Sequence, residues 1–249
     1  MTDAAAEPIA TSAPPLVGGS SSGQRWSELA FLHWRVPAEQ VAPLLPAGLR
    51  PDEFDGSSWV GLIPFVLDQA RILGSPPVPY FGSFVEVNVR LYAVDASGRR
   101  GVVFVSLEAS RLAAVLAARA AFSLPYEWSA TRVERNESDL RYTARRHLAR
   151  GVGCDIRVTR TESAVVGDPL ADFLTARWGL FTRRGRHTLF LPNEHPPWQL
   201  FEARLASIDD SLLAAAGFSG LVDRAPDSVL YSPGVTTRFG TPLRIAGSG

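Results

Sequence analysis

The stretch from Ser83 to Tyr92, S-F-V-E-V-N-V-R-L-Y, alternates strictly between two kinds of side chain. One set of alternate positions is aliphatic, namely Val85, Val87, Val89 and Leu91. The other set holds Phe84, Glu86, Asn88, Arg90 and Tyr92. A period of two is typical of a β-strand, because successive side chains point to opposite faces. The alternation alone leaves open whether the polar face meets water or lines a pocket.

Strand-like segments recur along the chain. Alternating or β-rich apolar patterns occur at 28–36, 59–66, 101–108, 129–135, 140–146, 154–160, 187–192, 198–205, 229–231 and 241–245. Predicted helices are few and short, at 37–45, 110–122, 168–178 and 209–217, and most begin with a proline or an N-capping residue. This pattern predicts an α+β fold built on a large, mainly antiparallel sheet that can close into a barrel.

The chain has 249 residues, with no internal repeat and no long polar linker after Trp26, so we expect a single domain over residues 25–246. Residues 1–24 are rich in Ala, Ser, Pro and Gly, and we expect them to form a disordered tail without a signal-peptide core. No apolar run is long enough for a membrane-spanning helix. One cysteine, Cys154, fits a reducing compartment, and we place the protein in the cytoplasm.

The composition also limits the partners. The 25 basic residues balance the 25 acidic residues, which gives no electrostatic reason to bind nucleic acid or an anionic membrane. The four histidines show no local spacing of metal ligands, and the usual nucleotide-binding glycine motifs do not occur. We therefore expect no metal and no cofactor. The expected partner is a small-molecule ligand, and the sequence is compatible with a homo-oligomer.

Several motifs resemble one family. They are H-W-R at 33–35, F-D-G-S-S-W-V-G-L-I-P-F at 54–65, the alternating stretch at 84–92, L-P-Y at 124–126 and H-P-P-W at 195–198. In this order they resemble the YqjF-like proteins of the domain-of-unknown-function 2071 (DUF2071) family, from about Trp26 to the C-terminus. That family is placed in the acetoacetate decarboxylase-like superfamily, so the resemblance implies a cone-shaped β-barrel around a ligand cavity. The family itself has no generally established activity.

The more distant likeness to the decarboxylases implies positions for a site. Arg35 falls where they hold a cavity arginine, and Glu86 falls where they hold an active-site glutamate. Their two lysines, the first of which forms a Schiff base, correspond to Tyr126 and Glu127. The chain contains no lysine, and arginine stays protonated and cannot act as the amine nucleophile. We therefore predict that this protein is not an amine-catalysed decarboxylase.

The candidate catalytic residues are Arg35, Glu86 and Tyr126. Arg35 would orient an anion, Glu86 would move a proton and Tyr126 would donate a hydrogen bond to an oxygen. The alternative for Arg35 and Glu86 is a structural ion pair between strands. Candidate substrate-binding residues are His33, Phe84, Asn88, Arg90, Tyr92 and Glu127. His33 is equally compatible with a structural role, and we expect His195 to fix a turn beside two prolines.

The leading hypothesis is a protein whose cone-shaped barrel binds a small molecule. If it is an enzyme, we expect non-covalent acid–base chemistry of the lyase or isomerase type, such as decarboxylation, dehydration or isomerisation of a small carboxylate or carbonyl compound. The alternatives are a non-catalytic binding or sensing module for a hydrophobic metabolite, and an interaction protein whose barrel is filled by side chains. Under the leading hypothesis, Glu86 and its polar neighbours face the cavity, and the valines pack outside beneath helices or loops.

Overall fold

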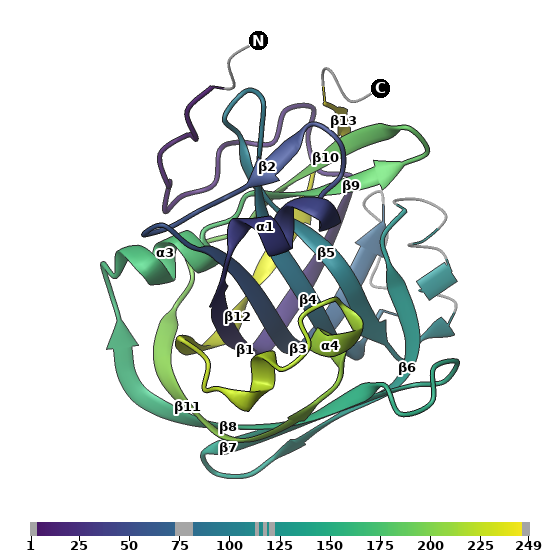
Figure 1. Cartoon of the computed structure of the whole chain (residues 1–249), viewed down its shortest axis with the longest axis vertical. Helices are drawn as coiled ribbons and strands as arrows, with labels where there is room; N and C mark the ends of the chain where they lie inside the picture. The colour runs from purple at the N-terminus through teal and green to yellow at the C-terminus, as the bar shows by residue number, and fades with distance from the viewer. Residues whose placement is uncertain (1–3, 73–81, 113–114, 117–118, 120–122, 246–249) are drawn as a thin grey trace.

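A computed structural model describes residues 4–72, 82–112, 115–116, 119 and 123–245 of the chain (Figure 1). This part is dominated by a mainly antiparallel sheet of 13 strands. The strands are β1 (Ser22–Val36), β2 (Leu49–Pro51), β3 (Ser58–Ile72), β4 (Phe84–Asp95), β5 (Arg100–Ala109), β6 (Tyr126–Arg135), β7 (Asp139–Arg146), β8 (Gly153–Val165), β9 (Gly179–Arg184), β10 (His187–Glu194), β11 (Leu200–Asp210), β12 (Ser228–Phe239) and β13 (Leu243–Arg244). The predicted α+β class is confirmed.

Strand pairing closes this sheet into two rings. In the first ring, β5 pairs with β4, the path continues through β3, β1, β12, β10 and β9, and β9 pairs again with β5. In the second ring, the path from β5 to β12 runs instead through β6, β7, β8 and β11. The rings share β5, β4, β3, β1 and β12, which we call the shared wall. The strands of this wall therefore have an enclosed space on each side.

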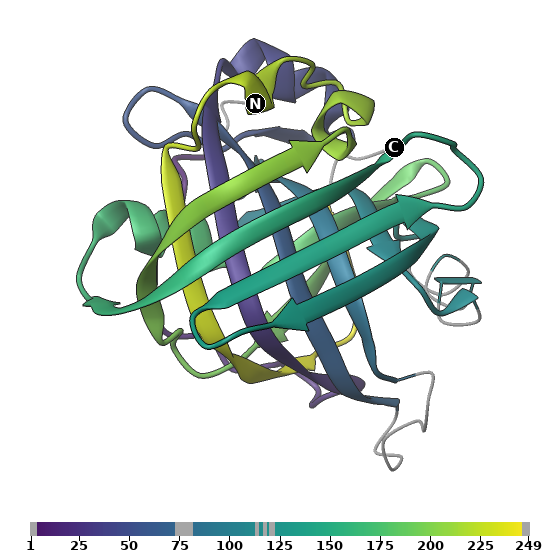
Figure 2. The ribbon, with the colours of Figure 1, turned by 90° about the horizontal axis from the view of Figure 1, so that it is seen from below.

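The second ring is filled by a hydrophobic core. Figure 2 shows β6, β7, β8 and β11 crossing over the strands of the shared wall. The core between these layers includes Leu32, Trp34, Val60, Leu62, Val87, Val89 and Leu91 from the wall and Leu140, Tyr142, Ile156 and Val158 from β7 and β8. The expectation that the valines of β4 lie outside beneath helices or loops is therefore wrong in its main part. A second layer of strands covers them, since the chain folds back across the wall after β5.

The opposite face of the shared wall looks into the first ring. Leu29, Phe31, Ile63 and Phe65 form a separate buried cluster on this side. Glu86, Asn88 and Tyr92, which belong to the polar set of β4, are also buried. Both faces of β4 thus point into the protein. The alternating side chains of this strand place aliphatic groups in the second ring and mostly polar groups in the first ring.

Helices occupy few positions. The helix predicted at 37–45 appears as α1 (Ala38–Val41) with the 3-10 helix η1 (Ala42–Leu44), that at 168–178 as α3 (Pro169–Thr175), and that at 209–217 as α4 (Leu212–Ala215), followed by η2 (Leu221–Asp223). Asp168 caps α3 as expected, because its Oδ1 accepts the backbone N–H groups of Leu170 and Ala171 at 2.8 and 3.2 Å. Much of the helix predicted at 110–122 lies outside the described residues. No helix in the described part of the chain has the length and apolar character needed to cross a membrane.

The N-terminal segment differs from the predicted disordered tail of residues 1–24. β1 already begins at Ser22, and residues 4–21 are mostly exposed but contact the sheet at a few positions. The backbone N–H of Glu7 donates to the carbonyl oxygen of Gly98 at 2.8 Å, and the indole N–H of Trp178 donates to the carbonyl of Ala10 at 2.7 Å. Composition could not predict these contacts, because the partners come from distant parts of the chain.

The close approach of β12 and β1 within the shared wall depends on Gly234. Its φ is 123°, and an added Cβ would overlap the carbonyl oxygen of Trp26. We expect Gly234→Ala to lower the free energy of unfolding by about 2–4 kcal/mol, because backbone strain and steric overlap both add a cost. The control is Gly167→Ala, where φ is 67° and nothing lies within 4 Å of the added Cβ, so only about 1 kcal/mol should be lost. Equal losses in urea denaturation would contradict the role given to the close approach.

Candidate functional site

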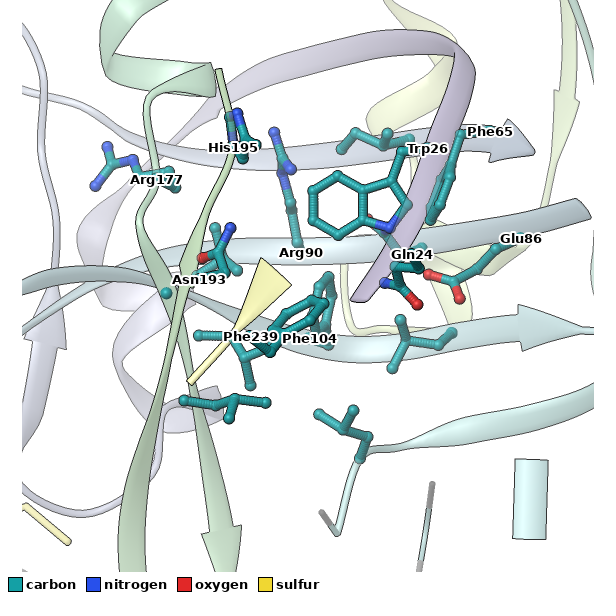
Figure 3. A pocket seen from close by; sticks show the side chains of 18 of the residues that line it. Gln24, Trp26, Phe65, Glu86, Arg90, Phe104, Arg177, Asn193, His195 and Phe239 are labelled. Carbon is teal, nitrogen blue, oxygen red and sulfur yellow. The ribbon is translucent and has the colours of Figure 1, made fainter. Parts of the chain in front are cut away.

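The first ring surrounds a partly open cavity of about 190 Å³ (Figure 3). Every strand of that ring contributes to its wall. The aromatic side chains in the lining are Trp26, Phe65, Phe104, Tyr126, Trp198 and Phe239. Polar groups are segregated within it: Figure 3 shows Arg90, Arg177, Asn193 and His195 toward one end and Gln24 and Glu86 toward the other. The cavity is therefore largely apolar, with differently charged ends.

Glu86 is the acid of this cavity. Its side chain is buried, and the hydroxyl of Tyr126 donates to its Oε2 at 2.8 Å. Burial raises the pKa of Glu86 from 4.5 to about 7, with a smaller upward effect from Glu108, while hydrogen bonds from Tyr126 and Asn88 act in the opposite direction. A carboxyl group with this pKa can both release and accept a proton near neutral pH.

Tyr126 reaches Glu86 because β5 lies between β4 and β6 and pairs with both strands. Glu86 lies opposite Ala109 in the pairing of β4 with β5, and Tyr126 lies opposite Leu107 in the parallel pairing of β5 with β6. Burial and the neighbouring Glu86 raise the pKa of Tyr126 well above its ordinary value. The phenol therefore keeps its proton and serves as a hydrogen-bond donor.

Arg90 stands four residues from Glu86 on the same face of β4, which is about 13 Å along an extended strand. Its Nε donates to the hydroxyl of Tyr92 at 2.9 Å, and its Nη2 donates to the carbonyl oxygen of Leu174 at 3.0 Å. None of the ion pairs found among the described residues involves Arg90. This lining guanidinium is thus held by neutral acceptors and keeps an unneutralised charge.

Tyr92 and His33 lie behind Arg90 rather than in the cavity lining. The hydroxyl of Tyr92 donates to the carbonyl of Leu174 at 3.0 Å and lies 2.6 Å from Nε2 of His33. Burial lowers the pKa of His33 well below its ordinary value, and the charges of Arg90 and Arg177 lower it further. His33 therefore stays neutral, and both residues support the position of Arg90.

Arg177 brings a second guanidinium to the same end of the cavity. Its Nη1 lies 2.5 Å from Oδ2 of Asp52, and Nη1 of Arg100 lies 2.5 Å from Oδ1 of the same carboxylate. The Nε of Arg177 donates to the carbonyl of Phe173 at 2.7 Å, but its Nη2 is buried without a partner. One carboxylate is therefore shared between two arginines.

His195 also reaches the cavity, although the sequence assigned it only to a turn. Its Nδ1 lies 2.7 Å from the carbonyl oxygen of Pro196, so this nitrogen carries the proton. Burial lowers the pKa of His195 to about 4. The neutral ring packs between Trp178 and Trp198, each at 4.6 Å between ring centroids. His195 thus contacts both the turn at Pro196 and the cavity.

Other predicted site residues are not part of the lining. Arg35 pairs with Asp55 at 3.4 Å and stacks over Trp59, so it does not form the expected pair with Glu86. Glu127 pairs with Arg119 at 3.3 Å and is about one-third exposed, because the residue after Tyr126 on the strand points the other way. Phe84 packs against the apolar cluster of the first ring.

Sequence patterns did not indicate several lining residues, including Gln24, Trp26, Arg177, Asn193 and Trp198. Gln24 fell within the expected tail, and Arg177 lies just beyond α3 with no motif around it. These side chains meet only when the first ring closes. Among the described residues, no group of three or more His, Cys, Asp or Glu side chains is placed to hold a metal ion.

A family comparison agrees with the motifs. The sequence profile of DUF2071, described as an uncharacterized conserved protein, matches residues 23–236. The chain belongs to the DUF2071 family. The uncharacterized protein YqjF of Bacillus subtilis (strain 168) is 31% identical to it over 182 residues, which are 72% of this chain and 75% of that protein.

Solved structures extend the likeness of this DUF2071 chain. An acetoacetate decarboxylase-like enzyme from Sphingomonas wittichii RW1 matches with a TM-score of 0.64 and 14% identity, over 91% of this chain and 94% of that one. The enduracididine biosynthesis enzyme MppR, complexed with pyruvate, matches with a TM-score of 0.65 and 14% identity over 93% of each chain. At this identity the likeness concerns the fold, and it confirms the predicted acetoacetate decarboxylase-like cone-barrel.

The raised pKa of Glu86 predicts how stability depends on pH. A carboxyl group whose pKa is higher in the folded state stabilises the fold fully below pH 4.5, and this contribution is lost as the pH rises through about 7. Relative to Glu86→Gln, which does not titrate, the natural protein should lose about 3 kcal/mol of unfolding free energy between pH 4.5 and pH 8. Urea denaturation at both pH values measures this difference. A stability difference between the natural protein and Glu86→Gln that does not change with pH would contradict the raised pKa of Glu86.

The shared carboxylate of Asp52 gives a second prediction. We expect Asp52→Asn to cost about 3–5 kcal/mol of unfolding free energy, because it leaves Arg177 buried without a counter-charge. Asp55→Asn is the matched control, since it breaks the exposed pair with Arg35 and should cost about 1 kcal/mol or less. Thermal denaturation of the two variants compares them, and similar losses would show that the buried pair adds no special stability.

Proposed function

We propose that this DUF2071 chain binds a small carboxylate or carbonyl compound in the cavity of the first ring and moves a proton on it without a covalent intermediate. The observation that carries the proposal is the pair of Glu86 and Tyr126, joined at 2.8 Å inside the cavity. The pKa of Glu86, raised to about 7 by burial, suits proton transfer at neutral pH.

The proposed step begins with ionised Glu86 accepting a proton from the carbon next to a carbonyl group. The electron pair of that C–H bond moves toward the carbonyl oxygen, which becomes an enolate oxygen. Protonation of Glu86 releases the hydroxyl of Tyr126, which can then donate to this oxygen. Return of a solvent-derived proton from Glu86 to the same carbon gives exchange, and its delivery to another carbon gives isomerisation. Dehydration follows when a neighbouring hydroxyl group takes the proton from Glu86 and leaves as water.

Arg90 takes the anchoring role that the sequence assigned to Arg35. Arg90 lines the cavity and has no acidic partner among the described residues, whereas Arg35 is paired with Asp55 away from the lining. A carboxylate on the ligand would supply the missing charge. Asn88, between Glu86 and Arg90 on the same face, would contact the middle of the ligand.

Covalent amine catalysis is not part of the proposal. The chain has no lysine, and the position expected for the Schiff-base amine holds Tyr126. Pyruvate is bound in the solved structure of MppR, which supports an oxo acid as one class of compound to test. A single cysteine supports the cytoplasm as the place of action.

Deuterium exchange tests the proton transfer without a known substrate. A panel of 2-oxo and 3-oxo acids is incubated with the protein in D₂O, and loss of the C–H signal next to the carbonyl is followed by NMR. Exchange should increase with pH up to about 7 and then level off, because only ionised Glu86 accepts the proton. Glu86→Gln should reduce the exchange rate about 10²- to 10⁴-fold while the compound still binds.

Glu127→Gln is the matched control for this experiment, because Glu127 is a neighbouring carboxylate that points out of the cavity. It should exchange at the natural rate. Natural exchange in Glu86→Gln would eliminate Glu86 as the base. Binding of panel compounds without any exchange would instead support the alternative, a non-catalytic binding or sensing module.

A further inference from the structure

We propose that the cavity is built for a carboxylate attached to an aromatic ring, with the carboxylate at Arg90 and Arg177 and the ring beside Trp26, Phe65 and Trp198. This inference rests on the proposed function for the use of the cavity as a ligand site. It adds the class of ligand, the end of the cavity that takes the anion and the group that fills the apolar part.

The first argument is the charge at the arginine end. Arg90 and Arg177 line this end, and Arg100 lies outside the lining. The only ionic partner of these three among the described residues is Asp52, which pairs with Arg100 and Arg177. Among the described residues, Arg90 donates hydrogen bonds to the hydroxyl of Tyr92 and the carbonyl of Leu174, which are both neutral. The charges of Arg90 and Arg177 also help to lower the pKa of His33 behind them. An anion at this end would balance an excess of positive charge in a region of low dielectric.

The second argument is the set of buried polar atoms without partners. Nη2 of Arg177 and Nε1 of Trp26 are donors, Oδ1 of Asn88 is an acceptor, and all three residues line the cavity. Buried polar atoms are normally hydrogen-bonded, because leaving one unpaired costs free energy. Figure 3 shows Arg177 at the arginine end, whereas the indole nitrogen of Trp26 points toward Gln24 and Glu86. A ligand carboxylate at the arginine end would supply an acceptor oxygen for Nη2 of Arg177.

The third argument is the size of the cavity. Its volume is about 190 Å³. A cavity of about 150 Å³ lined by apolar side chains can hold benzene. The space therefore accommodates one aromatic ring together with a short polar chain. A three- or four-carbon acid would leave much of the volume unfilled.

The fourth argument is the aromatic wall. Trp26 and Trp198 are nearly parallel, at 11°, with centroids 6.2 Å apart, and Phe65 meets Trp26 edge-on at 6.0 Å. Figure 3 shows Trp26 between Arg90 and Glu86, and Phe65 beyond Trp26 on the side of Glu86. Such a wall offers both stacked and edge-to-face contacts to another ring. A ring placed there keeps the carboxylate toward Arg90 and the connecting carbons within the polar row of β4.

Binding of three probes to the natural protein tests this class. Isothermal titration calorimetry is carried out with 3-phenylpropionate, with propionate, which lacks the ring, and with 4-phenylbutan-2-one, in which a methyl ketone replaces the carboxylate. We expect 3-phenylpropionate to bind about 10- to 100-fold more tightly than propionate, because its ring is buried. It should also bind at least about tenfold more tightly than the ketone. Equal binding of the first two probes, or of the first and third, would overturn the proposal.

Variants locate the anion. Arg90→Gln should weaken binding of 3-phenylpropionate about 10- to 100-fold and change binding of 4-phenylbutan-2-one less than threefold. Binding of the uncharged probe also reports that the variant is folded. Arg35→Gln is the matched control, because this arginine is absent from the lining, and it should bind all probes as the natural protein does. An equal loss for both probes in Arg90→Gln would contradict the placement of the carboxylate.

The outcome can be separated from that of the proposed function. The probes carry no oxo acid group, so their binding is measured separately from the proton transfer. Selective binding of this probe without deuterium exchange on any oxo acid would support the ligand class and refute the proton transfer. Deuterium exchange that depends on Glu86, combined with no preference for the ring, would support the proton transfer and refute the ligand class.

Discussion

The shared wall between the two rings is the constraint on which the rest of this structure depends. β4 pairs with β3 and β5 along its edges, and one face is covered by the core of the second ring. A strand enclosed on both faces is usually apolar throughout. β4 alternates instead, because its other face looks into a cavity where polar side chains find partners or remain available to a ligand. The apolar core thereby supplies the rigid support for a polar row.

That enclosure explains the chemistry of the site. Burial raises the pKa of Glu86 to about 7, whereas the same carboxyl group in water would be ionised at neutral pH. It also makes each guanidinium dependent on nearby acceptors, which are provided by Tyr92, Leu174 and Asp52. The groups behind Arg90 are neutral, so they do not balance its positive charge at the cavity. Burial of these polar and charged groups lowers the stability of the fold. Their arrangement is the basis for the proposed binding of an anion.

The likeness to acetoacetate decarboxylase-like structures lies in the fold, whereas the position implied for the Schiff-base amine is changed. The position implied for the amine holds Tyr126, whose hydroxyl is bonded to Glu86 in the cavity. The position implied for the cavity arginine holds Arg35, which faces Asp55 instead. Arg90 and Arg177, from other parts of the chain, bring guanidiniums to the cavity. Acid–base chemistry on an anion is therefore compatible with this barrel without a lysine.

The sequence by itself determined the α+β class, most strands, the alternation of β4 and the absence of an amine nucleophile, because these depend on side-chain period and residue type. It also indicated Glu86, Asn88, Arg90 and Tyr126, which lie in the cavity lining. Only the tertiary structure decided that the valines of β4 face a second layer of strands and that Arg35 and Glu127 point elsewhere. Gln24, Arg177, Asn193 and His195 come from distant segments, and closure of the first ring brings them together. A local pattern specifies which residues share a face, but long-range strand pairing decides what that face encloses.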